Sequence, residues 1–233
     1  MGKRIITQAR GKGSHTYKVK RSAFRHELKY PRNLNGEVTV VKLINSAGHS
    51  APIAKINFEK KSFYIPAHYK MFEGQKINFG SDKIESGRIM MLKDIPVKTK
   101  IYCIESKPND GGTFIKTAGS SATVNKVIGN KVFVLMPSKK EKELSENCRA
   151  IIGVVAGAGR LEKPVIKAGK KHYIKKAKSK LWPRTSAVKM NAIDHPFGSG
   201  RGKNPKSKIA KRNAPPGRRV GLLRPKRTGK KKR

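Results

Sequence analysis

The residues that most resemble a site of chemistry are Asp194 and His195, in the stretch 190–200 (MNAIDHPFGSG). A histidine titrates near neutral pH, and an adjacent carboxylate can orient it for acid–base catalysis. However, Pro196 holds His195 extended, and the hydroxyl of Ser199 lacks the strand–turn–helix motif that activates a catalytic serine. We therefore predict that His195 positions a ligand by hydrogen bonding. Asp194 is predicted to organise the turn, with a backbone N–H or an arginine as its partner.

Positive charge dominates the two ends of the chain. The net charge is +41 and the pI is near 10.7. Residues 1–35 contribute +9, residues 36–176 contribute +14 and residues 177–233 contribute +18. From 163 to 233, one acid stands against twenty-five lysines and arginines. Such a segment cannot fold tightly alone because its charges repel each other, and the composition is typical of nucleic-acid-binding proteins.

Three glycines, Gly153, Gly157 and Gly159, precede a short basic segment. Their spacing is not the G-x-G-x-x-G of a dinucleotide-binding loop, and no helical pattern follows them. Glycines also allow close approach to a nucleic-acid backbone, with Arg160 and Lys163 on phosphates. We favour this second interpretation.

The middle of the chain consists of short apolar segments separated by turn residues, which is typical of β-strands. The expected strands are 37–44, 54–58, 63–65, 76–79, 89–92, 101–104, 122–128, 131–136 and 150–155. The dipeptide Gly129-Asn130 predicts a tight hairpin. Residues 138–147 are predicted to form a polar turn, and no long amphipathic helix is expected. The spacing predicts a mainly β fold of two small barrels at 36–92 and 93–176, between basic extensions at 1–35 and 177–233.

The C-terminal extension is rich in glycine and proline and carries apolar residues among its charges, which favours a segment threaded into a structured partner. Trp182 could stack on a base or pack on the second barrel. Stacking on a base contributes about 1–3 kcal/mol, which is similar to the free energy of burying a large side chain. The size of the free energy therefore does not distinguish stacking from packing. Pro183 beside it favours packing.

Several classes of protein are disfavoured by what the sequence contains. Cys103 and Cys148 are too few and too far apart for a disulfide framework or a zinc site. The histidines lack metal-ligand spacing, so we expect no metal, no cofactor and no small-molecule substrate. The longest apolar run, 150–159, is far shorter than the about 20 residues of a membrane span. With no visible signal peptide, a soluble intracellular protein is expected.

Charge alone does not distinguish DNA from RNA. DNA-reading modules such as a helix-turn-helix, a zinc finger or a basic zipper are not recognisable, whereas small β-barrels are common among RNA-binding proteins. A histone-like DNA-compacting protein would need a helical or β-ribbon dimer. An RNA-modifying or RNA-cleaving enzyme would need paired acids, or a nucleophile and a base, which the acid-poor ends lack. RNA binding is therefore favoured.

The stretch 190–200 closely resembles the signature of the second large-subunit ribosomal protein, the L-two family, in its archaeal and eukaryotic form. The same family is also resembled by four further stretches, which occur along the chain in the order found in the family. They are 1–13, 152–169, 182–183 and 212–229. There are departures. Ser199 interrupts the family's glycine run, Lys189 stands where a small apolar residue is usual, and 60–90 matches weakly. We expect Ser199 to cause a local adjustment of the backbone and no loss of binding.

The resemblance implies an OB-like barrel followed by an SH3-like barrel, with both extensions buried in ribosomal RNA. It implies a cytoplasmic structural constituent of the large ribosomal subunit, with large-subunit rRNA and neighbouring ribosomal proteins as partners and no membrane. Such a protein supports subunit association and sends the segment around Asp194 and His195 towards the peptidyl-transferase centre. The ribosomal reaction is carried by RNA, so the protein is not expected to be an enzyme.

The predicted rRNA-binding residues are mostly cations in the stretches that carry the resemblance. They are Arg4, Arg10, Lys12, Arg160, Lys163, Lys167, Trp182, Asn191, Asp194, His195, Arg201, Lys203, Arg212, Arg218, Arg219, Lys226 and Arg227.

Overall fold

The computed structural model describes the chain except residues 1, 35, 60, 80–83, 201–207 and 224–233. The chain divides into two compact units. One unit is Arg21–Lys167, and the other combines Met1–Lys20 with Ala168–Arg233.

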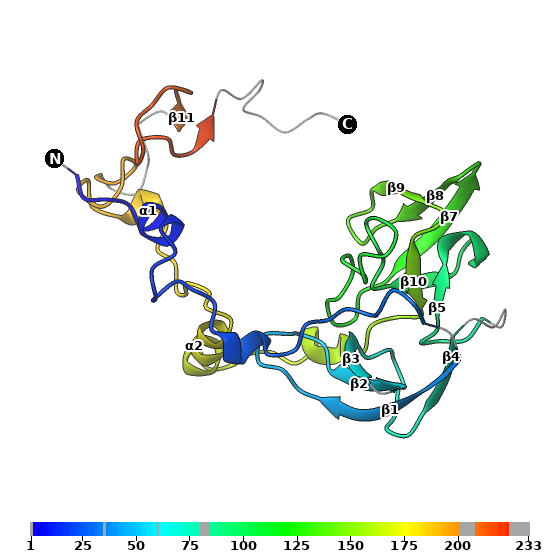
Figure 1. The fold of residues 1–233 in the computed structure, drawn as a ribbon. Coiled ribbons are helices and arrows are strands. Elements are labelled where there is room, and N and C mark those ends of the chain that lie inside the picture. The colour runs from blue at the N-terminus through cyan, green and yellow to red at the C-terminus, as the bar shows by residue number, and fades with distance from the viewer. Residues whose placement is uncertain (1, 35, 60, 80–83, 201–207, 224–233) are drawn as a thin grey trace. The chain divides into compact units, whose positions relative to one another are not determined.

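The first sheet of Arg21–Lys167 is antiparallel, with strand order β3-β2-β1-β4 (Figure 1). Its strands are β1 (Gly36–Ile44), β2 (Ile53–Phe58), β3 (Lys61–Pro66) and β4 (Lys76–Phe79). Val38 and Val40 are buried while Glu37 and Thr39 face solvent, which is the alternation that a half-buried strand requires. The strands expected from the sequence here are confirmed.

The second sheet is also antiparallel, with order β5-β10-β6-β7-β8-β9. Its strands are β5 (Ile89–Met91), β6 (Lys100–Tyr102), β7 (Ala122–Ile128), β8 (Lys131–Leu135), β9 (Glu141–Ser145) and β10 (Arg149–Ile152). The hairpin around Gly129-Asn130 is confirmed, since Ile128 pairs with Lys131.

Two details of the second sheet differ from expectation. Residues 141–145, predicted to lie in a polar turn, form the edge strand β9, in which only Leu144 is buried. A strand with one apolar residue gives no hydrophobic pattern to detect. Strand β5, expected within the first barrel, pairs with β10 instead. The domain boundary between 92 and 93 otherwise stays a prediction.

The core of this unit has two parts. One cluster includes Ile56, Ile65 and Ile77 of the first sheet together with Tyr102 and Ile151 of the second, so the two sheets share a core. The other cluster lies within the second sheet and its connections, and it includes residues such as Leu92, Val132 and Val134. The mainly β fold is therefore confirmed as two antiparallel sheets. Over the described residues, the strand order of each sheet is linear, and pairing between the first and last strands does not close either sheet into a barrel.

Residues 21–34, expected to belong to a basic extension, contribute to this folded unit. Leu28, Tyr30 and Leu34 are buried, and a 3-10 helix spans Arg21–Phe24. The Tyr30 hydroxyl lies within hydrogen-bonding distance of the carbonyl oxygens of Cys103 (3.2 Å) and Arg149 (3.1 Å). The segment is thus anchored on the second sheet.

A buried ion pair fixes the same region. The Glu105 side chain is 0% exposed, and its Oε1 accepts a hydrogen bond from Nη2 of Arg149 at 2.9 Å. The carboxylate also accepts from the backbone N–H groups of Arg149 (2.8 Å), Asn109 (3.2 Å) and Gly111 (3.0 Å). Nη1 of Arg149 donates to the carbonyls of Pro31 (3.0 Å) and Arg32 (2.6 Å). One ion pair therefore ties β10 both to the loop that contains Glu105 and to the N-terminal segment at Pro31 and Arg32.

The unit made of Met1–Lys20 and Ala168–Arg233 has little regular structure. It contains α1 (Ile6–Gly11), α2 (Ala168–Ala177) and the parallel pair β11 (Ile209–Ala210) and β12 (Leu222–Leu223). Helix α2 occupies the end of the segment predicted as the second barrel. It carries four lysines and no acid, and none of its residues is buried. Its backbone therefore forms a helix without the apolar stripe by which a helix is recognised.

The remaining short helices are 3-10 turns at Leu92–Asp94, Ala158–Leu161 and Ala187–Lys189. Within the described ranges of the chain, no helix is long and apolar enough to cross a membrane.

Candidate nucleic-acid interface

Residues 190–199 form a loop held by its own backbone. The carbonyl of Asn191 accepts hydrogen bonds from the N–H groups of Asp194 (3.0 Å) and His195 (3.3 Å), and the carbonyl of His195 accepts from Gly198 (2.8 Å). Ser199 N–H donates to the Met190 carbonyl at 3.1 Å and closes the loop. The conformation is therefore set by local bonds.

The loop also fixes the ring of His195. Phe197 N–H donates to Nδ1 of His195 at 3.0 Å, so Nδ1 carries no proton and the neutral ring holds its proton on Nε2. Burial lowers the pKa of His195 below its usual value of 6.5. At neutral pH the side chain is thus an uncharged N–H donor. With Nδ1 already bonded, a proton-shuttling role through both ring nitrogens is disfavoured.

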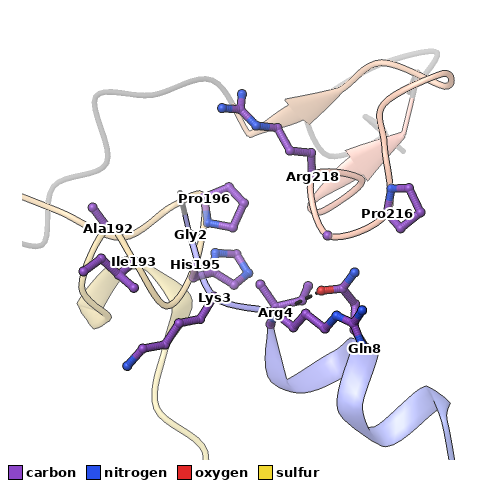
Figure 2. Close-up of a pocket in the computed structure, with 12 residues that line it drawn as sticks. Gly2, Lys3, Arg4, Gln8, Ala192, Ile193, His195, Pro196, Pro216 and Arg218 are labelled. Atoms are coloured by element: carbon purple, nitrogen blue, oxygen red, sulfur yellow. Dashed lines mark hydrogen bonds between the residues drawn. The ribbon is translucent and has the colours of Figure 1, made fainter.

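The loop borders a cavity of about 670 Å³ formed by three separate segments (Figure 2). Arg4 and Gln8 come from the N-terminal segment and α1, His195 comes from the loop, and Arg218 comes from the turn before β12. Lys3 N–H donates to the Ile193 carbonyl at 2.9 Å and joins the first two segments. The described lining residues include three cations (Lys3, Arg4 and Arg218) and no carboxylate. Such a cavity suits an anion, and a phosphate group offers the acceptors that arginines and an Nε2–H require.

A second, smaller cavity of about 180 Å³ lies beside the same loop. Arg10 of α1, Asp194 and His195 are among its lining residues. The Asp194 carboxylate lies 4.0 Å from the Lys3 ammonium. The partner that the structure shows for Asp194 is therefore a lysine, where a backbone N–H or an arginine was expected.

Two positions in the loop depend on small residues. A Cβ at Gly198 would lie 2.2 Å from the Asn191 carbonyl oxygen, so no side chain fits there. Ser199 has a φ of 82°, in the left-handed region that glycine favours. The family that this stretch resembles has glycine at this place, so a serine with this φ adds local backbone strain.

We predict that Gly198→Ala opens the loop. The added methyl must displace the Asn191 carbonyl, which caps the N–H groups of Asp194 and His195. The Phe197-to-His195 bond should be lost, and the His195 pKa, measured by NMR titration, should rise towards 6.5. Gly169→Ala is the matched control, since nothing lies within 4 Å of a Cβ there. A His195 pKa unchanged in the Gly198 variant would contradict this account.

The other predicted site residues of this unit lie on its surface without converging on the cavities. Lys12 caps the end of α1, and Asn191, Arg212 and Arg219 are exposed. The Arg219 guanidinium donates to the Ala214 carbonyl. Arg201, Lys203, Lys226 and Arg227 lie outside the described residues.

Trp182 is half-buried, with the Lys171 ammonium of α2 over its ring at 5.5 Å from the centroid. This cation–π contact shows packing within its own unit. Base stacking by Trp182 stays a prediction.

Arg160, Lys163 and Lys167 belong to the Arg21–Lys167 unit and are exposed. Gly153 and Gly157 nearby have positive φ (118° and 84°), consistent with glycine being required by the backbone.

Sequence reasoning missed Lys3 and Gln8 as site residues. Gln8 Oε1 accepts from the N–H of Ile5 at 3.1 Å and holds the start of α1. A glutamine at the third position of a helix is one half of a known start signal, but the serine or threonine that normally precedes it is replaced here by Ile5, so the sequence signal is weak. Gly217 packs on the same Gln8 side chain.

The site thus holds cations and one neutral imidazole around a space suited to phosphate. Among the residues that the structure describes, no group of three or more histidines, cysteines or acids is placed to hold a metal ion. The fold and the site define a basic, mainly β protein with a loop that borders a cation-lined cavity.

Comparison with known proteins gives the family. Residues 85–217 match the family described as "Ribosomal Proteins L2, C-terminal domain". The chain is 44% identical to the large ribosomal subunit protein uL2 of Methanococcoides burtonii, over 99% of this chain and all of that protein. It is 42% identical to uL2 of Hyperthermus butylicus, over the full length of both, and 44% identical to uL2 of Archaeoglobus fulgidus, over 98% of this chain and 99% of that protein. The chain belongs to the uL2 family of large-subunit ribosomal proteins. This confirms the resemblance seen in the sequence and the expectation of a non-enzymatic protein of translation.

Proposed function

We propose that the protein is a structural component of the large ribosomal subunit that binds rRNA through its two basic ends. The observation that carries the proposal is the cavity at Arg4, His195 and Arg218, where three segments present cations and a neutral imidazole. The net charge of +41 supports a polyanionic partner, and family membership points to rRNA.

In this proposal the two sheets correspond to the OB-like and SH3-like barrels implied by the motif resemblance. Arg160, Lys163 and Lys167 would contact phosphates near Gly153 and Gly157, where the lack of side chains lets the backbone approach RNA. The 177–233 segment would thread into rRNA and contact neighbouring ribosomal proteins.

We further propose that the 190–199 loop lies towards the peptidyl-transferase region and that the protein supports subunit association in the cytoplasm. The sequence of the loop supports the first point. Its chemistry limits the role to positioning, because the Nε2–H of His195 donates a hydrogen bond and Nδ1 is held by Phe197 N–H.

The proposal predicts the behaviour of His195→Gln. Glutamine keeps an uncharged side chain with a donor and an acceptor but loses the ring that lies 5.1 Å from that of Phe197. We expect large subunits to assemble at near-normal levels, whereas translation by those subunits should fall. Subunit yield and peptide synthesis per subunit are the two measurements. Equal loss of both would show that His195 is needed for assembly.

The direct test of the proposed function is sedimentation of cell lysate through a sucrose gradient at low and moderate salt. The protein should migrate with the large subunit at both salt concentrations. A protein found only in the light fractions would overturn the proposal.

A further inference from the structure

A cavity of about 290 Å³ lies in the Arg21–Lys167 unit, remote in sequence from the 190–199 loop. Tyr69, Ser86, Thr99, Lys100 and Gly153 are among its lining residues. Its volume is at the lower limit of the about 300–1,000 Å³ of small-molecule sites, which suits one base and not a longer ligand.

Tyr69 is the unusual residue of this cavity. The residue is 64% exposed, and leaving an aromatic ring in water forgoes the large gain from burying it. Its backbone is nevertheless fixed. Tyr69 N–H donates to the Val154 carbonyl at 2.9 Å, and its carbonyl lies 2.7 Å from Nδ1 of the buried His68. The ring is therefore an exposed aromatic surface on a rigid support.

One cation lies over this ring and another lines the cavity. The Lys70 ammonium is over the Tyr69 ring, 5.8 Å from its centroid. Lys100, the first residue of β6, is exposed, and its carbonyl accepts from Gly153 N–H at 2.8 Å. Ser86 and Thr99 add hydroxyl groups that can bond to the edge of a base. Proteins that bind unpaired RNA combine an aromatic stacking surface, cations for the backbone and polar groups for the base edge in this way.

We propose that this cavity binds a single unstacked RNA base, which stacks on Tyr69 while Lys70 and Lys100 contact the adjoining phosphates. This proposal rests on the proposed function of rRNA binding. It adds a second rRNA-binding site, which lies on the Arg21–Lys167 unit. Gly153 has a specific part in it. Its φ of 118° favours glycine, and the missing side chain leaves the cavity open beside Ser86.

The test uses the full-length chain and a transcript of large-subunit rRNA, with affinity measured at several salt concentrations. Tyr69→Ala should weaken binding about 5- to 150-fold, the range that corresponds to the loss of one stacked base. The slope of affinity against salt should not change, because no charge is removed. Tyr69→Phe keeps the ring and should bind as the wild type does.

Phe72→Ala is the matched control, since Phe72 is 61% exposed and is not among the residues lining the cavity. It should leave affinity unchanged. Lys100→Gln should reduce the salt slope by about 0.7, the value for one phosphate contact on a single strand.

Three results would overturn the proposal while leaving the proposed function intact, since wild-type rRNA binding is measured in the same experiment. The first is that Tyr69→Ala binds rRNA as tightly as the wild type and enters large subunits normally. The second is that Tyr69→Ala and Phe72→Ala lose affinity equally, which would indicate a general effect of surface aromatics. The third is that Tyr69→Ala spares rRNA affinity but lowers incorporation into large subunits, which would make Tyr69 a contact for a protein. If the wild type itself fails to bind rRNA, the proposed function fails first.

Discussion

Replacing Glu105 with glutamine is expected to lower the thermal midpoint of the Arg21–Lys167 unit by about 6–20 °C. Removing one partner of a buried ion pair costs about 3–5 kcal/mol, and about 2–4 °C is lost per kcal/mol in a domain of this size. The measurement is the unfolding midpoint of the full-length chain, followed by circular dichroism in the β-sheet region.

The size of this effect follows from the number of donors around Glu105. Both carboxylate oxygens accept hydrogen bonds, from the backbone of Arg149, Asn109 and Gly111 and from the Arg149 guanidinium. The NH2 group of a glutamine would have to face some of these donors, and Arg149 would keep a buried charge without its counter-ion. Arg149→Met should be at least as harmful, because it also frees the carbonyls of Pro31 and Arg32.

Glu143→Gln is the matched control. Its carboxylate pairs with Lys131 at 2.7 Å, but the two side chains are 49% and 62% exposed. An exposed pair contributes about 0–1 kcal/mol, so its midpoint should fall by no more than about 4 °C. Equal shifts in the two variants would show that the Glu105 pair does not hold the N-terminal segment on the second sheet.

The sequence predicts those elements whose pattern is local. The β7–β8 hairpin follows from Gly129-Asn130 between two apolar runs, and β1 follows from the alternation at Val38 and Val40. Strand β9 has one buried residue, Leu144, and its place is set by pairing with β8. Helix α2 has no apolar face. Both lack the periodicity on which such predictions depend.

The candidate site shows the same limit. The sequence predicts Arg4, His195 and Arg218 as site residues because each lies in a stretch that resembles a family. Only the folded structure brings the three residues to one cavity. The bond from Lys3 N–H to the Ile193 carbonyl joins residues at opposite ends of the chain. The pairing of Glu105 with Arg149 spans 44 residues. No local pattern specifies such contacts, because they depend on how the whole unit packs.

Deleting residues 177–233 is expected to weaken rRNA binding strongly while leaving the Arg21–Lys167 unit folded. The buried residues of both hydrophobic clusters lie between Tyr30 and Val155, so the deletion removes no buried side chain of either cluster. The thermal midpoint should therefore match that of the full-length protein. The deleted segment carries nineteen lysines and arginines and one acid, so binding should lose most of its electrostatic part.

The dependence of rRNA affinity on salt concentration measures this loss of electrostatic binding. A protein with about 6–10 phosphate contacts loses about 10³–10⁵ in affinity between 50 and 200 mM salt, and we expect this steep fall for the full-length chain. The deletion variant should bind more weakly at low salt and show a much shallower slope, since each lost contact reduces the slope by about 0.7–0.9. Removing only 224–233, which holds seven of the nineteen cations, should give an intermediate slope. An unchanged slope after deletion of 177–233 would mean that the C-terminal segment does not neutralise phosphates and that the exposed cations of Arg21–Lys167 carry the binding.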